Sequence, residues 1–129
     1  MKIEHLALWV DNLERMRKFY TQYFGMSAGD KYSNREKQYA SYFLHFEKVR
    51  TRIELMHRPD IIPHAGQRGM KQGIAHFAIS VGSREKVMER TERLRQDGYT
   101  IISEPRTTGD GYFESVVLDP EENYVEITI

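Results

Sequence analysis

Two histidines and two glutamates recur in this sequence at matching intervals. His5 and His76 lie 71 residues apart (76 minus 5). Glu54 and Glu126 lie 72 residues apart (126 minus 54). Neutral imidazole and carboxylate groups together suit Zn²⁺, Ni²⁺, Co²⁺ or Mn²⁺. Such a metal polarises a substrate oxygen as a Lewis acid, and a carboxylate beside it moves a proton between adjacent carbons. The four residues are therefore candidate metal ligands, and the two glutamates are candidate catalytic bases.

The matching intervals come from an internal repeat. Residues 3–10, IEHLALWV, match residues 74–81, IAHFAISV, and both follow the pattern I-x-H-apolar-A-apolar-x-V. Each copy is followed by a polar cap, an apolar stripe at helical spacing and a glycine, Gly25 in the first half and Gly98 in the second. The glutamates close the two halves, each between two apolar residues. The repeat predicts one amphipathic helix in each half, within residues 11–25 and 83–98.

Alternation along the chain predicts the strands around these helices. We expect an α+β fold of two tandem βαβββ modules, residues 1–57 and 74–129, in one domain of 129 residues. Residues 58–73 contain several prolines and glycines and read as the linker. The other expected strands are 39–46, 51–56, 112–118 and 124–129, with shorter ones near 28–32 and 100–103.

The alternation also separates an apolar from a polar face on each strand. The four candidate ligands lie on the polar faces, where a curved sheet would bring them together. The side chains that share those faces are candidates for the wall of a substrate pocket, and they are Trp9, Arg52, Met56 and Ser80. Trp9 would either fill the cavity or stack against a substrate.

Two other interpretations of the repeated residues stay open at this level. A histidine in a strand is more commonly structural than a metal ligand. A glutamate between apolar residues is more commonly the solvent-facing side chain of a half-buried strand. A histidine that packs in the protein core would also appear in both halves if the duplication copied it. The agreement of four positions in register favours the metal site.

Composition narrows the classes of partner. There are no cysteines, which excludes disulfides and thiolate metal sites. Nineteen basic and 19 acidic residues give zero net charge, which argues against nucleic acid and anionic membranes as partners. The N-terminal residues enter a strand-like pattern at once and lack the apolar core of a signal peptide, so we expect a cytoplasmic protein with a small-molecule substrate.

The duplicated pattern, with I-x-H-x-A opening each module and apolar-Glu-apolar closing it, resembles the vicinal oxygen chelate (VOC) superfamily of glyoxalases, bleomycin-resistance proteins and dioxygenases. The resemblance covers residues 2–129. Residues 107–126, TTGDGYFESVVLDPEENYVE, are similar to the ending of many glyoxalase-like proteins. The resemblance to this superfamily implies a cup-shaped, largely antiparallel sheet with helices on the outer face.

The order of the four ligands matches that of glyoxalase I. The resemblance implies one divalent metal per site, with Glu126, or Glu54 opposite it, as the base. Glyoxalase I converts the hemithioacetal of methylglyoxal and glutathione to S-lactoylglutathione through a metal-bound enediolate. Glyoxalase I commonly has an arginine four residues after the first ligand, which holds a glutathione carboxylate. Trp9 stands at that position, so this contact to glutathione is missing.

A metal-dependent lyase or isomerase of glyoxalase I type is therefore the leading expectation. A metal-free binding protein of the bleomycin-resistance type is the main alternative. A ring-cleaving dioxygenase is less favoured, because those sites use three protein ligands. The superfamily also implies a homodimer in which His5 and Glu54 of one subunit meet His76 and Glu126 of the other at the interface. Pairing within one chain remains the other possibility.

Overall fold

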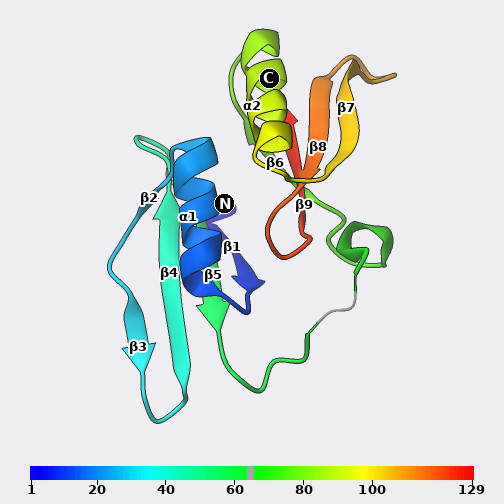
Figure 1. The fold of residues 1–129 in the computed structure, drawn as a ribbon. Helices are drawn as coiled ribbons and strands as arrows, with labels where there is room; N and C mark the ends of the chain where they lie inside the picture. Colours follow the sequence, from blue (N-terminus) through cyan, green and yellow to red (C-terminus); the bar gives the residue numbers. More distant parts are fainter. Residues whose placement is uncertain (64–65) are drawn as a thin grey trace. The chain divides into compact units, whose positions relative to one another are not determined.

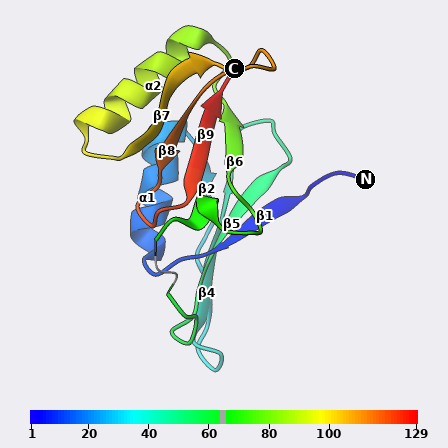
Figure 2. The same cartoon turned by 90° about the vertical axis from the view of Figure 1, so that its right-hand side faces the viewer.

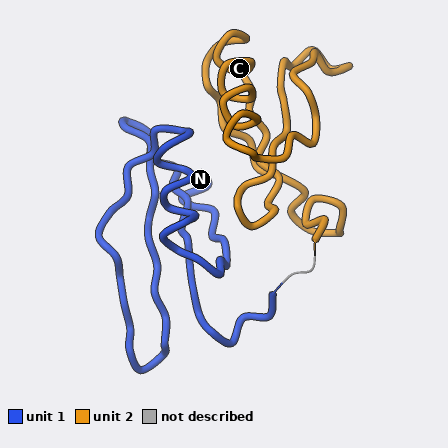
Figure 3. The backbone as a smooth tube through the Cα atoms, in the orientation of Figure 1, with its two compact units in different colours: residues 1–63 blue, residues 64–129 orange. Residues whose placement is uncertain are grey.

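Each half of the repeat folds as a strand, a helix and a set of strands that return beside the first. A computed structural model describes residues 1–63 and 66–129 (Figure 1). His64 and Ala65, within the expected linker, lie outside the described residues. The chain divides into two units at residue 63 (Figure 3). Neither helix in the described residues has the length and apolar character needed to cross a membrane.

Unit 1 is built around a mixed five-stranded sheet. Its elements are β1 (His5–Trp9), α1 (Leu13–Phe24), β2 (Ser27–Ala28), β3 (Tyr32–Asn34), β4 (Tyr39–His45) and β5 (Arg52–His57). The strand order is β1-β5-β4-β2, and β3 also pairs with β4. β1 runs parallel to β5, whereas the other pairs are antiparallel. The first and last strands of the module therefore lie side by side.

Unit 2 repeats this arrangement with four strands. A 3₁₀ turn (Arg68–Met70) precedes β6 (Phe77–Ser80), α2 (Arg84–Gln96), β7 (Ile101–Thr107), β8 (Phe113–Leu118) and β9 (Tyr124–Thr128). The strand order is β6-β9-β8-β7, with β6 parallel to β9 and the other pairs antiparallel. The first and last strands of the module are again neighbours.

The helices form where the sequence provides caps and an apolar stripe. Asn12 caps α1 by accepting a hydrogen bond from the backbone N–H of Arg15 at 2.9 Å. Gly25 ends α1 in the left-handed region, with φ of 67°. Ser83 caps α2 in the same way as Asn12 caps α1. α1 packs on β4 and β5 (Figure 1), and α2 packs on β7, β8 and β9 (Figure 2). Each helix therefore covers one face of its sheet and leaves the other face for the polar side chains.

The expected α+β fold of two βαβββ-like modules is confirmed. The expected strand at 28–32 is instead two short strands, β2 and β3, which pair with different parts of β4. The expected strand at 100–103 continues to Thr107 through two register shifts. Pro105 lacks the N–H that a regular ladder needs, so the sequence pattern stops before it, while an irregular edge strand tolerates it.

Candidate metal centre

His5 and Glu54 lie side by side on the helix-free face of unit 1. His5 is on β1 opposite Arg52, and Glu54 is two residues further along β5, opposite Ala7. Because β1 and β5 are parallel, both side chains point to one face. His5 Nε2 lies 3.7 Å from Glu54 Oε2. The His5 side chain is 38% exposed and that of Glu54 is 14% exposed, so the carboxylate is largely shielded from solvent while the imidazole is not.

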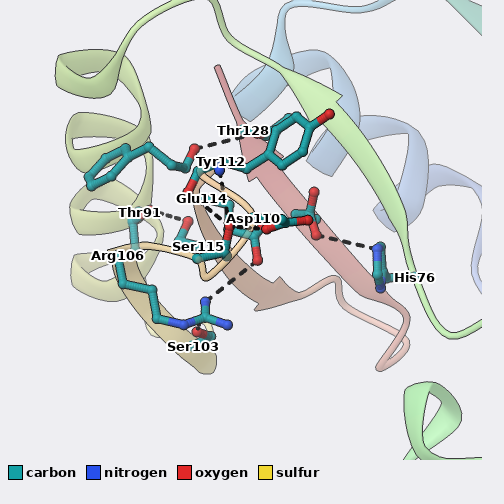
Figure 4. Close-up of polar contacts among 12 residues, drawn as sticks. His76, Thr91, Ser103, Arg106, Asp110, Tyr112, Glu114, Ser115 and Thr128 are labelled. Atoms are coloured by element: carbon teal, nitrogen blue, oxygen red, sulfur yellow. Dashed lines mark hydrogen bonds and ion pairs between the residues drawn. The ribbon is translucent and has the colours of Figure 1, made fainter.

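His76 and Glu126 form the equivalent pair in unit 2. His76 immediately precedes β6, and Glu126 lies on β9 opposite Ala78. His76 Nε2 lies 3.3 Å from Glu126 Oε2 (Figure 4). The imidazole is again the more exposed partner, at 47% against 15% for the carboxylate. The repeated sequence pattern therefore places a histidine beside a glutamate in both units.

The two pairs have the chemistry of half a metal site each. Each pair offers one imidazole nitrogen and one carboxylate oxygen, which are ligands for borderline divalent metals. Within each unit's described residues, no group of three or more His, Asp or Glu side chains gathers for a metal. Two pairs together supply the four nitrogen and oxygen ligands that such an ion takes. The residues therefore fit a divalent metal, provided that the pairs are joined.

The His5–Glu54 pair has partners that the sequence did not reveal. The Glu4 carboxylate contacts both His5 Nδ1 and the Arg52 guanidinium, and Arg52 also lies over the Phe43 ring, 4.0 Å from its centroid. The positive charge of Arg52 is therefore paired with the negative charge of Glu4. An imidazole whose Nδ1 donates to a carboxylate keeps Nε2 free as a metal-binding lone pair. Nε2 is the atom that faces Glu54.

The His76–Glu126 pair has a different partner, a second carboxylate. Glu114, on β8, lies beside Glu126 and is 3.6 Å from Arg106, which also donates to Ser103 Oγ at 2.7 Å (Figure 4). Burial raises the pKa of Glu126, and the negative charge of Glu114 adds to this rise, while the neighbouring His76 and the positive charge of Arg106 oppose it. A carboxylate with a raised pKa is suited to proton transfer near neutral pH.

The raised pKa of Glu126 predicts how the metal-free protein responds to pH. Protonated Glu126 stabilises the fold below the ordinary pKa of 4.5, and this contribution is lost as pH rises through the raised pKa. Glu126→Gln cannot ionise, so the variant should gain stability over wild type as pH rises from the ordinary pKa of 4.5 through the raised pKa of Glu126. Urea unfolding with a chelator present measures this difference. Glu36→Gln, at an exposed turn position, serves as the control, and an equal gain in both variants would contradict the assignment.

The remaining predicted pocket residues lie on the expected faces. Trp9 is 36% exposed and meets the Tyr39 ring edge-on at 6.3 Å between centroids. Met56 is half-buried on β5, and Ser80 is exposed at the end of β6. Sequence reasoning missed Tyr39, whose hydroxyl donates to Glu54 Oε1 at 3.0 Å. Tyr39 shares a strand face with Phe43, which lies directly opposite Glu54, and this pairing depends on a register that the sequence does not reveal.

Comparison with known proteins agrees with this architecture. The model of the Glyoxalase/Bleomycin resistance protein/Dioxygenase superfamily matches residues 2–127. The chain belongs to this superfamily. Members share the duplicated scaffold but differ in chemistry, so membership alone does not name a reaction.

Several relatives in the superfamily are described as glyoxalases. "Lactoylglutathione lyase GLX1" of Arabidopsis thaliana is 30% identical over 91% of this chain, and "Uncharacterized protein YqjT" of Bacillus subtilis is 26% identical over 97%. The match covers 40% of the Arabidopsis protein and 96% of YqjT. The chain therefore spans less than half the length of the plant lyase. Glyoxalase I from Zea mays superposes with a TM-score of 0.77 at 26% identity, covering 98% of this chain and 44% of the maize chain.

Proposed function

We propose that this protein is a metal-dependent lyase or isomerase of the glyoxalase I type. Its substrate would be a small α-oxygenated molecule such as the hemithioacetal of methylglyoxal with a thiol. The observation that carries this function is the matched geometry of the two His–Glu pairs, 3.7 Å in unit 1 and 3.3 Å in unit 2. The family match and the similarity to lactoylglutathione lyases support it.

His5, Glu54, His76 and Glu126 would hold one divalent ion, Zn²⁺, Ni²⁺, Co²⁺ or Mn²⁺. When bound, the ion would supply Lewis acid polarisation of two neighbouring substrate oxygens. The protein's own part is to present two imidazole nitrogens and two carboxylate oxygens from three strand positions and from His76, which immediately precedes β6. The parallel pairing of β1 with β5, and of β6 with β9, fixes those positions. A ligand set built on strands is held more rigidly than one built on loops.

Glu126 is the residue assigned to proton transfer. Its carboxylate would take the proton from the carbon that carries the hemithioacetal hydroxyl and return it to the neighbouring carbonyl carbon, while the hydroxyl proton passes to the former carbonyl oxygen, so that a thioester and a new hydroxyl form. The first carbon is oxidised and the second reduced within one molecule, so no external oxidant or reductant is required. The burial that raises the pKa of Glu126 favours this role. Glu54 would remain a ligand.

The complete site would form at the interface of a homodimer. β1 and β6 each stand at the end of their sheet's strand order, so each unit's histidine lies on or beside an edge strand. An edge strand has unpaired backbone groups that favour pairing or covering by another element. Joining unit 1 of one subunit to unit 2 of the other would unite the two His–Glu pairs.

Turnover is tested with metal-loaded protein and hemithioacetals of methylglyoxal with glutathione, cysteine and CoA, followed by proton NMR. We expect product from at least one thiol, and a fall of about 10²–10⁴-fold in kcat for Glu126→Gln, since that variant loses the base. The matched control is Glu104→Gln, whose carboxylate accepts from Arg95 at 2.6 Å on the same sheet. Full activity of Glu126→Gln, or no product from any thiol in the presence of bound metal, would contradict the proposed reaction.

Binding without turnover is the second candidate, and one observation favours it. Trp9 and Tyr32, on either side of Tyr39, are 36% and 55% exposed, which leaves aromatic surface beside the His5–Glu54 pair. Exposed aromatic rings bind flat apolar ligands. A binding protein of this kind would keep its ligand affinity after treatment with a chelator, whereas the lyase would lose activity.

A further inference from the structure

The two carboxylate oxygens of Glu54 have different surroundings. Oε1 accepts a hydrogen bond from the Tyr39 hydroxyl at 3.0 Å, and Oε2 lies 3.7 Å from His5 Nε2. The carboxylate is only 14% exposed, so the phenol replaces solvent at Oε1. We propose that Tyr39 is a positioning residue, which holds Glu54 by Oε1 so that Oε2 is turned toward His5 and the metal position. This inference rests on the metal site of the proposed function.

Strand pairing and contacts with other aromatic rings restrict the Tyr39 side chain. It opens β4, where Asn34 of β3 pairs with it, and it shares the face of Phe43, which lies opposite Glu54. Its ring meets Trp9 edge-on, at 88° between planes, and is tilted against Tyr32 at 6.0 Å. Aromatic edge contacts of this kind restrict the ring. The hydroxyl is thereby presented to Glu54 from a side chain that strand pairing and ring packing both fix.

Among the described residues of the second module, Glu126 has different neighbours. The groups that act on Glu126 include the Glu114 carboxylate, which shares its face of the β8–β9 pair, and His76. A phenol hydroxyl donates to Glu54 and restricts one of its oxygens, whereas the Glu114 carboxyl acts on Glu126 both by its charge and by a hydrogen bond, and both raise the pKa of Glu126. The matched glutamates of the two modules are therefore held differently. Loss of the Tyr39 hydroxyl should act through Glu54 and leave the His76–Glu126 pair unchanged.

The effect on a metal ligand of losing its outer hydrogen-bond partner is known in general terms. A partner that orients a ligating carboxylate contributes about 10–100-fold to metal affinity. Tyr39→Phe keeps the ring that packs on Trp9 and removes only the hydroxyl. We therefore expect Tyr39→Phe to bind Ni²⁺ about 10–100-fold more weakly than wild type, with the thermal unfolding of the metal-free protein little changed.

Tyr32→Phe is the matched control, because Tyr32 belongs to the same ring cluster and is 55% exposed. Affinity for Ni²⁺ would be measured by competition with a chelating dye, and the ligand field by the visible spectrum of the Co²⁺-loaded protein. Tyr32→Phe should match wild type in both, whereas Tyr39→Phe should shift both. In a Glu54→Ala background, Tyr39→Phe should have no further effect on affinity, because the oxygen that accepts its hydrogen bond is gone.

The outcomes separate this inference from the function on which it rests. Wild-type affinity and spectrum in Tyr39→Phe would overturn the positioning role while leaving the metal site intact. An equal loss from Tyr39→Phe in the wild-type and Glu54→Ala backgrounds would also overturn it, because the hydroxyl would then act independently of Glu54. Absence of Ni²⁺ and Co²⁺ binding by wild type would overturn both the proposed function and the role given to Tyr39.

Discussion

Wild-type protein loaded with Ni²⁺ or Zn²⁺ and then desalted should retain about one metal ion per chain, and the double variant His5→Ala, His76→Ala should retain none. The variant loses both nitrogen donors. Two carboxylates that remain are hard ligands, which hold borderline metals poorly without imidazole. Elemental mass spectrometry of the desalted proteins gives the ratio of metal to protein directly.

His45→Ala controls for the general effect of removing a histidine. His45 lies on β4 in the same row as His5, two strands away, with Arg52 of β5 between them. Its loss should leave the metal content at the wild-type value. Retention of metal by the double variant would remove His5 and His76 from the ligand set. Absence of metal in wild type would favour the binding protein without turnover over the lyase.

The two His–Glu pairs could be predicted from the sequence because both halves of a repeat adopt the same arrangement of strands. The histidine opens the first strand of unit 1 and immediately precedes that of unit 2, the glutamate lies on the last strand of each, and these two strands are neighbours in each sheet. Period-two alternation then places the pair on one face, opposite the buried Ile53 and Ile127. The sequence of one module alone would not have indicated that its histidine and its glutamate lie next to each other.

The partners of the pairs depend on cross-strand register, which no local pattern encodes. Tyr39 and Glu54 are 15 residues apart, and the β4–β5 ladder brings them to 3.0 Å. A shift of one residue in that ladder would turn Tyr39 to the helix-covered face. Glu114 reaches Glu126 in the same way through the β8–β9 ladder. Sequence reasoning found the residues that repeat and missed those that differ between the modules.

These differences give the two halves of the repeat distinct chemistry. In unit 1 a phenol donates to the glutamate, whereas in unit 2 burial and a neighbouring carboxylate raise the pKa of the glutamate. A hydrogen bond to one oxygen of a carboxylate orients its other oxygen, which suits a ligand. A carboxylate with a raised pKa suits proton exchange. In the proposed function, the duplication supplies four ligand positions, and Glu126 is also the base.

Mixing two inactive variants tests whether each site is shared between subunits. His5→Ala damages unit 1 only, and His76→Ala damages unit 2 only. If unit 1 of one chain pairs with unit 2 of its partner, a heterodimer contains one site with both lesions and one site with none. Random exchange of subunits makes about half of the dimers mixed, so about a quarter of the wild-type metal content and activity should return.

A second mixture, His5→Ala with Glu54→Gln, is the matched control. Both lesions lie in unit 1, so every site of that heterodimer contains one lesion, whichever way the subunits pair, and no intact site forms. Recovery in the first mixture but not in the second would place His5 and His76 of each site on different chains. If neither mixture recovers although tagged subunits are shown to exchange, the two modules pair within one chain. The parallel β1–β5 and β6–β9 pairs would be unchanged in that case, because each lies wholly inside its own unit.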